Sequence, residues 1–336
     1  MGRQRTGDIS RDPPERVKLQ LRQEVGLGCP VADCHEPFLS WHHFDPPWCR
    51  EHHHRPEGMI ALCVRHHAMA DRGNFEDSQL REYKTAGLTA ELVKARFEWS
   101  RLRQLVRLGG FYATPAGTVE LYNRGFCPLL TFNENDQAFL ELSFALQDQS
   151  GRTLAEMRRN MFQAAPPHLF DIDVDTGGTR IRIRVTSSDV VLDIRTKKYT
   201  IEELTELLHA DWTRWIRFRD RWSESSPNFR THQVIEERIG PVLRRRRILG
   251  GQPDPASPVP ILPTEEQSTE YRDSTIKSVL AHANYLKSAD GYVCVLNVQN
   301  LVTYQSGVKW EVRDGFSQTD PTGDFTGWGF GSMMLK

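Results

Sequence analysis

Apolar residues in the first third of the chain recur at mostly helical intervals. Residues 1–25 are polar and rich in arginine and proline, which predicts a flexible arm with one short helix near Val17 to Val25. Residues 76–86 and 89–108 have the spacing of helices with one apolar face. The second ends at Gly109-Gly110, a common helix stop, and is predicted to connect two domains.

From about residue 111 to 198, apolar and polar positions alternate with the period of β-strands. The turn Asp175-Thr-Gly-Gly178 predicts a hairpin between two of these strands. One arm carries aspartates and the other arginines, which favours ion pairs across a solvated face over an acidic metal site. These residues are Asp171, Asp173 and Asp175, and Arg180, Arg182 and Arg184. The predicted strands are 118–122, 138–144, 169–174, 180–185 and 190–194.

The rest of the chain is predicted to be mainly helical. Thr200-Ile-Glu-Glu203 is a capping box that begins a helix through about Trp222, with Trp212 and Trp215 in its apolar stripe. A proline-rich linker is predicted at 250–265. The remaining elements are a helix at 230–248, a helix at 268–288 and a strand at 291–299.

Composition indicates a soluble protein without a membrane anchor. The chain has 336 residues, of which 38% are hydrophobic, and that length suits two or three domains. No apolar run approaches the roughly 18 residues that span a bilayer, and the N-terminus lacks the apolar core of a signal peptide. Six cysteines in such a chain predict metal ligands in a reducing, cytoplasmic compartment, with Cys127 and Cys294 as buried thiols.

Four cysteine and histidine residues have zinc-ligand spacing. Four residues separate Cys29 from Cys34, and Cys63-x-x-His66 follows, which supplies the ligands of one tetrahedral structural zinc. Two alternatives remain open, because Cys49 could replace one ligand and a histidine of the run 52–54 could replace His66. The same run could instead be a solvated, charged loop that reaches phosphate.

Three histidines, His42, His43 and His67, remain unassigned after this cluster. Paired imidazoles are poorly suited to an apolar core, so a second, catalytic metal is the favoured explanation. The competing explanation is a zinc module without catalytic activity.

Two segments carry a resemblance to the HNH endonucleases. They are His42-His43-x-x-Pro46 and Leu62-Cys63-x-x-His66-His67-x-x-x-Asp71-x-Gly73. The resemblance covers roughly residues 26–86 and implies a hairpin followed by a helix around one divalent ion, supported by a zinc knuckle. In this chain the family's usual middle asparagine is replaced by Gly58.

The resemblance implies roles for individual residues. His43 would be the general base, and His42, His67 and Asp71 would hold the catalytic ion. Imidazole and carboxylate ligands suit Mg²⁺ or Mn²⁺, with Zn²⁺ or Ni²⁺ also compatible. Gly58 keeps open a zinc-stabilised DNA-binding or assembly module that does not cut.

Positive charge is concentrated in two segments although the net charge is −1. The first segment contains Arg101 and Arg103, and a solvated helix face explains it as well as a phosphate contact does. The second is a run of four consecutive arginines, for which a protein partner is the alternative to DNA. Phosphate contacts supply most sequence-independent affinity for DNA, so both segments are candidates for binding it. The run consists of Arg244, Arg245, Arg246 and Arg247.

The combined prediction is an α+β metal-dependent endonuclease acting on DNA, by analogy a bacterial or phage restriction or antiviral defence effector. A homo-oligomer, or dependence on a sensor or guide-binding partner, is also expected. The predicted parts are an arm (1–25), the nuclease module (26–88), a helical connector (89–110), a β-rich regulatory or recognition domain (111–249), the linker (250–265) and a C-terminal α/β segment that packs on the preceding domain (266–336).

Overall fold

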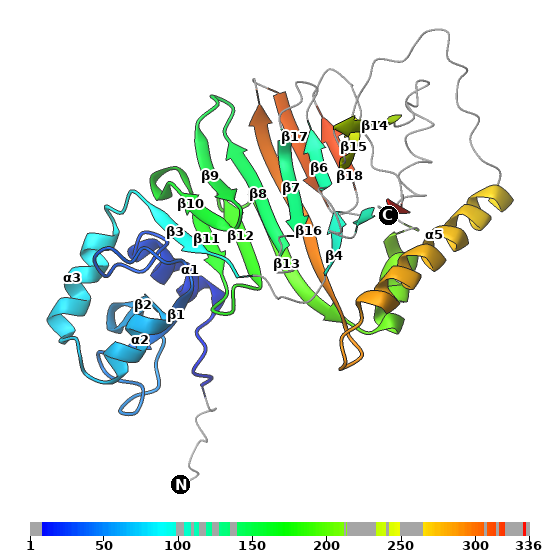
Figure 1. The fold of residues 1–336 in the computed structure, drawn as a ribbon. Coiled ribbons are helices and arrows are strands. Elements are labelled where there is room, and N and C mark those ends of the chain that lie inside the picture. Colours follow the sequence, from blue (N-terminus) through cyan, green and yellow to red (C-terminus); the bar gives the residue numbers. More distant parts are fainter. Residues whose placement is uncertain are drawn as a thin grey trace. The chain divides into compact units, whose positions relative to one another are not determined.

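The computed structural model has the mixed α and β content that the sequence predicts (Figure 1). The chain divides into two compact units, Met1–Arg96 with Phe162–Asp189 (the N-terminal unit) and Phe97–Met161 with Val190–Lys336 (the C-terminal unit). Among the described residues, no helix has the length and apolarity needed to cross a membrane. The structure describes residues 9–98, 104–108, 111–113, 119–122, 128–134, 140–211, 213, 233–239, 242–248, 265–305, 308–313, 316–319 and 332–333.

The N-terminal unit is built around an antiparallel hairpin that is followed directly by a helix. Strands β1 and β2 pair from Leu39 opposite Cys63 to His43 opposite Met59. A core of buried apolar side chains that includes Leu21, Ile60 and Leu80 joins this hairpin to the helices. The elements are α1 (Glu15–Glu24), β1 (Leu39–His43), the short 3-10 turn η1 (Pro56–Gly58), β2 (Met59–Cys63), α2 (Val64–Asp71), α3 (Asp77–Gly87) and β3 (Val93–Arg96).

A second hairpin, much later in the sequence, belongs to the same unit. Strands β11 (Asp171–Val174) and β12 (Arg180–Arg184) pair antiparallel, preceded by β10 (Met161–Ala164) and the turn η2 (Pro166–His168). The predicted ion pairs across it are confirmed, with Arg184 2.6 Å from Asp171.

The prediction that this hairpin face is solvated is wrong at Asp171, which is fully buried, whereas Asp175 at its end is exposed. Helix α1 covers Asp171, and Arg22 donates two hydrogen bonds to the Asp171 carboxylate, at 2.7 and 3.0 Å. Since an uncompensated buried charge is costly, this pair ties α1 to the second hairpin.

The described part of the C-terminal unit contains two sheets and two helices. One sheet has the strand order β14-β15-β6-β7-β8-β9, and the other has β13-β16-β4-β5-β19 with β17 also beside β16 and β18 beside β17. The Thr303 hydroxyl accepts from the Gln147 N–H and donates to the Ala145 carbonyl, which connects β16 with β8. The elements are β4 (Leu105–Leu108), β5 (Phe111–Ala113), β6 (Val119–Tyr122), β7 (Pro128–Glu134), β8 (Leu140–Gln147), β9 (Thr153–Arg158), β13 (Val190–Tyr199), β14 (Gln233–Ile239), β15 (Val242–Ile248), α5 (Glu265–Leu286), β16 (Val293–Gln305), β17 (Val308–Arg313), β18 (Phe316–Thr319) and β19 (Ser332–Met333).

The predicted capping box at Thr200 is confirmed. The Thr200 hydroxyl accepts from the Glu203 N–H at 3.1 Å, and the Glu203 carboxylate accepts from the Thr200 N–H at 2.9 Å. Residues 201–211 are helical, and their buried Leu204 and Leu208 pack with Ile276 of α5. Trp212 and Trp215 lie outside the described residues.

Two predicted helices are wrong. Residues 89–108 contain strands β3 and β4, because Val93 and Ala95 alternate with exposed residues and are buried on one sheet face. The helix at 230–248 is a hairpin of β14 and β15, and Gly240-Pro241 between the strands is a sequence that a helix interior disfavours. Arg101, Arg103, Cys127 and most of the proline-rich linker lie outside the described residues.

The run of four arginines consequently lies on a strand, and its predicted place on a helix is wrong. In the backbone register of β14 with β15, the first two arginines are opposite glutamates, whereas Arg246 is opposite Ile235. Contact of the run with DNA stays a prediction. The four strand residues are Arg244, Arg245, Arg246 and Arg247.

Candidate metal centres

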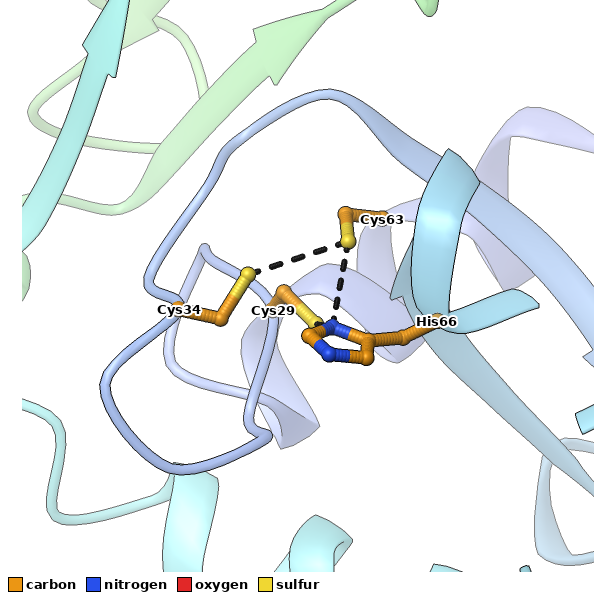
Figure 2. Close-up of side chains that lie close together, drawn as sticks. All are labelled: Cys29, Cys34, Cys63 and His66. Atoms are coloured by element: carbon orange, nitrogen blue, oxygen red, sulfur yellow. Dashed lines mark hydrogen bonds between the residues drawn. The ribbon is translucent and has the colours of Figure 1, made fainter. Parts of the chain in front are cut away.

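The four residues with zinc-ligand spacing converge beside the first hairpin (Figure 2). The Cys34 and Cys63 sulfurs are 3.7 Å apart, and Nδ1 of His66 lies 3.2 Å from the Cys63 sulfur and 3.3 Å from the Cys29 sulfur. A tetrahedral zinc would require about 3.8 Å between sulfurs and about 3.6 Å from sulfur to nitrogen. These three separations are close to the values for zinc, and all four ligand atoms lie within 4.8 Å of one another.

Burial of this Cys3His cluster gives it the character of a closed structural site. Cys29, Cys63 and His66 are each at most 3% exposed, and Cys34 is half-buried. Hydrogen bonds from Cys29 and Cys63 lower the pKa of Cys34 to about 3, whereas hydrogen bonding to Cys34 raises the pKa of Cys29. Bound zinc would stabilise all three as thiolates, so the donor set fits the ion.

The alternative ligand sets are not supported by the geometry. Cys49 is exposed and lies outside the cluster, and so does the histidine run 52–54. The four residues with zinc-ligand spacing in the sequence are therefore the ones that form the Cys3His cluster.

A second cluster forms on the face of the hairpin that α2 covers. His42, His67 and Asp71 offer ligand atoms that all lie within 4.8 Å of one another. Nδ1 of His42 is 3.1 Å from Oδ1 of Asp71, and Nε2 of His67 is 3.7 Å from the same oxygen. Asp71 follows His67 by four residues, one helical turn, so both side chains project from the same face of α2.

Ser40 fixes the ring of His67. The Ser40 hydroxyl donates to the Leu62 carbonyl at 3.1 Å and lies 3.0 Å from Nδ1 of His67. Because the hydroxyl donates its hydrogen to the Leu62 carbonyl, its oxygen accepts a hydrogen bond from the Nδ1–H of His67, and the lone pair of His67 is then on Nε2. That nitrogen is buried and has no hydrogen bond to any described residue, as expected of an atom reserved for a metal.

This second cluster is more open than the first. The Asp71 side chain is 50% exposed, whereas those of His42 and His67 are 11% and 21% exposed. A site with three protein ligands and an exposed edge has room for a further ligand from solution.

His43 lies next to this cluster in the chain but contacts different residues. Its Nε2 donates to the His53 carbonyl at 3.0 Å, so its Nδ1 carries the lone pair and has no hydrogen bond to a described residue. Burial, with a smaller effect of nearby His53, lowers the pKa of His43 to about 4. The ring is therefore uncharged at neutral pH and can accept a proton.

The three consecutive histidines have three different environments. His53 is buried, with Nδ1 accepting from the Arg55 N–H and Nε2 donating to the Pro46 carbonyl. His52 is exposed and stacks on Trp48 with ring centroids 4.5 Å apart. His54 is half-buried. The predicted solvated loop therefore fits His52 but not the other two histidines.

Gly58 occupies a position where no side chain fits. A Cβ there would lie 1.8 Å from the Asp45 carbonyl oxygen. The Gly58 carbonyl itself accepts hydrogen bonds from the Phe44 and Asp45 N–H groups, at 2.9 and 3.2 Å. Backbone contacts thus close the end of the hairpin at the position where the resembling family usually has asparagine.

Ser40 and Arg11 were not singled out by the sequence motifs, and the contact of the His53 carbonyl with His43 was not predicted. Ser40 could have been found from the strand period, since it lies two residues before His42 and shares its face. Burial is the main cause that lowers the pKa of His42, His43 and His67, and the positive charge of exposed Arg11 adds to the shift in all three. Arg11 has no ion pair within the described part of the chain.

Comparisons of the chain with family models, curated proteins and solved structures gave no match. The resemblance to HNH endonucleases therefore rests on the quoted sequence motifs, and membership of that family stays a prediction.

Proposed function

We propose that the chain is a metal-dependent endonuclease that hydrolyses phosphodiester bonds of DNA. One observation carries the proposal: the open cluster of His42, His67 and Asp71 is followed directly in the chain by a neutral His43 whose Nδ1 has no described partner. Consecutive Cα atoms are about 3.8 Å apart, so His43 is attached next to a candidate metal ligand. A closed zinc site or an ordinary core would not require an unpaired base at that position.

The donor set suits Mg²⁺ or Mn²⁺, with Zn²⁺ or Ni²⁺ as further candidates. A divalent ion there would neutralise charge that develops on the phosphate and on the leaving 3′ oxygen. His42 and His67 bind through ring nitrogens, and Ser40 holds the second of these rings in the required tautomer.

Nδ1 of His43 would take the proton of the attacking water as the water oxygen bonds to phosphorus. The His53 carbonyl, which accepts from Nε2, would keep the ring oriented and stabilise the imidazolium that forms. Exposed Arg11 is a suitable cation for a neighbouring phosphate. The P–O3′ bond breaks as the new bond forms, and the leaving 3′ oxygen takes a proton from solvent. The proton on His43 then passes to solvent, which restores the base.

The C-terminal unit and the chain's partners belong to the same proposal. A nuclease unit of this size has little surface for choosing a target, so the C-terminal unit would recognise DNA, regulate cutting or bind a sensor. By analogy with bacterial and phage restriction and antiviral defence effectors, we place the protein in the cytoplasm.

Cleavage of supercoiled plasmid by the zinc-loaded full chain, with added Mg²⁺ or Mn²⁺, tests the proposal. His43→Ala should lower the cleavage rate by about 10²- to 10⁴-fold while retaining zinc, thermal stability and DNA affinity. His52→Ala is the matched control, because it removes an exposed imidazole from the same loop. A His43→Ala protein that cuts at the wild-type rate refutes the assignment, and DNA binding without cleavage by any metal form favours the non-catalytic module.

A further inference from the structure

Two buried imidazole nitrogens on the same side of the hairpin have no hydrogen bond to any described residue. They are Nδ1 of His43 and Nδ1 of His54. The two ring centroids are 6.0 Å apart, and Trp48 packs against both, at 4.7 Å from His43 and 5.6 Å from His54. A buried polar atom without a hydrogen bond is unfavourable, so we expect each nitrogen to have a partner.

The separation of the rings limits which partner the two nitrogens can share. A direct N–H···N bond between imidazoles holds the ring centroids at most about 5.2 Å apart, which is shorter than the distance observed. One water molecule that bonds to both nitrogens extends the reach to about 7 Å. Buried waters are commonly found between such polar groups.

We infer that one water bridges Nδ1 of His43 and Nδ1 of His54, and that His54 is a positioning residue for the water that His43 deprotonates. The chemical role rests on the proposed nuclease function, whereas the bridge itself follows from the two nitrogens. Because Nε2 of His43 donates to the His53 carbonyl, the water must donate to Nδ1 of His43. The N–H at Nδ1 of His54 then donates a hydrogen bond to the water oxygen, which keeps its second lone pair available for attack on phosphorus.

Kinetics of the full, zinc-loaded chain on plasmid with Mg²⁺ or Mn²⁺ test the role of His54. His54→Phe keeps a ring against Trp48 but has no nitrogen, so we expect kcat to fall about tenfold to a hundredfold with KM and Tm unchanged. His54→Gln, which can still hydrogen-bond to the water, should recover most of kcat. His52→Phe is the control, since it changes a ring on the same tryptophan at an exposed position, and it should keep the wild-type kcat.

A high-resolution crystal structure of the wild-type chain tests the bridge without any cleavage assay. We expect one water within about 2.7–3.2 Å of both Nδ1 atoms and its loss in His54→Phe. Two protein groups or a metal ion on these nitrogens would overturn the inference, as would a His54→Phe protein with wild-type kcat. If the water is present and the wild-type chain cuts nothing, the nuclease proposal fails while the bridge stands.

Discussion

The two candidate metal clusters of the N-terminal unit share one hairpin and one helix, yet they differ in exposure and ligands. The Cys3His cluster is closed, with three of its four residues at most 3% exposed. The cluster of His42, His67 and Asp71 has no sulfur and keeps a half-exposed carboxylate. Structural zinc sites have the first character, and sites that bind a substrate or water have the second.

The difference follows from how neighbouring residues point. His66 and His67 are consecutive on α2, where side chains diverge by about 100° per residue, and they enter different clusters. His42 and His43 are consecutive on β1, where side chains alternate between faces, and they have different partners. A histidine pair on a regular element can therefore serve two sites, and each site can be changed separately.

The largest effect is expected from removing the closed cluster. Cys63→Ser should lose zinc and unfold the N-terminal unit, because structural zinc contributes about 10–16 kcal/mol and typical domains have only about 5–15 kcal/mol of stability. Metal analysis and thermal melting measure both. Cys49→Ser, an exposed cysteine outside the cluster, is the control and should change neither. A folded Cys63→Ser protein would show that the cluster is dispensable.

A smaller loss of stability is expected at a residue that touches neither cluster. Asp171→Asn leaves the buried Arg22 charge poorly compensated and should cost about 3–5 kcal/mol. Both clusters should then weaken together, since α1 also packs on the core beneath the hairpin. Asp173→Asn, whose side chain is 22% exposed, should cost less. Denaturant unfolding with zinc analysis measures the effect, and equal midpoints for the two variants would contradict it.

The metal affinity of the cluster of His42, His67 and Asp71 can be lowered separately by changing Ser40, which orients the His67 ring. Ser40→Ala frees the His67 ring and should lower affinity for Mn²⁺ by about tenfold to a hundredfold, with zinc content unchanged. Titration calorimetry gives the affinity, and Ser78→Ala on exposed α3 is the control. If Ser40→Ala binds Mn²⁺ as the wild type does, the serine does not orient the ligand.

The smallest effect on either cluster is expected from strand β15 of the C-terminal unit. Replacing its four arginines with glutamine should leave both clusters intact and reduce the slope of the salt dependence of DNA binding by about 0.9 for each phosphate that is no longer neutralised. Binding measured across salt concentrations separates the possibilities, because an unchanged slope would indicate a protein partner, or a surface with no role in binding. The replaced residues are Arg244, Arg245, Arg246 and Arg247.

Spacing in the sequence was sufficient to predict the Cys3His cluster, the helices α1 and α3, and the capping box at Thr200, whereas the grouping of His42, His67 and Asp71 came from the resemblance to HNH endonucleases. These features depend on residues close in the chain, where the turn of a helix or the pleat of a strand determines which side chains meet. Even the Cys3His ligands lie within one short stretch, from Cys29 to His66. The roles proposed for His43 and the catalytic ion stay predictions.

Tertiary structure decided the rest. Residues 89–108 have apolar spacings compatible with helix or strand, and pairing with distant β10 and β16 makes β3 and β4 strands. Arg22 and Asp171 are 149 residues apart, so only the folded chain shows that the second hairpin belongs with the N-terminal unit. Burial of His53 and the close approach at Gly58 likewise depend on packed neighbours. Local spacing encodes which side chains can meet on one element, whereas burial and pairing depend on contacts that the whole chain must form.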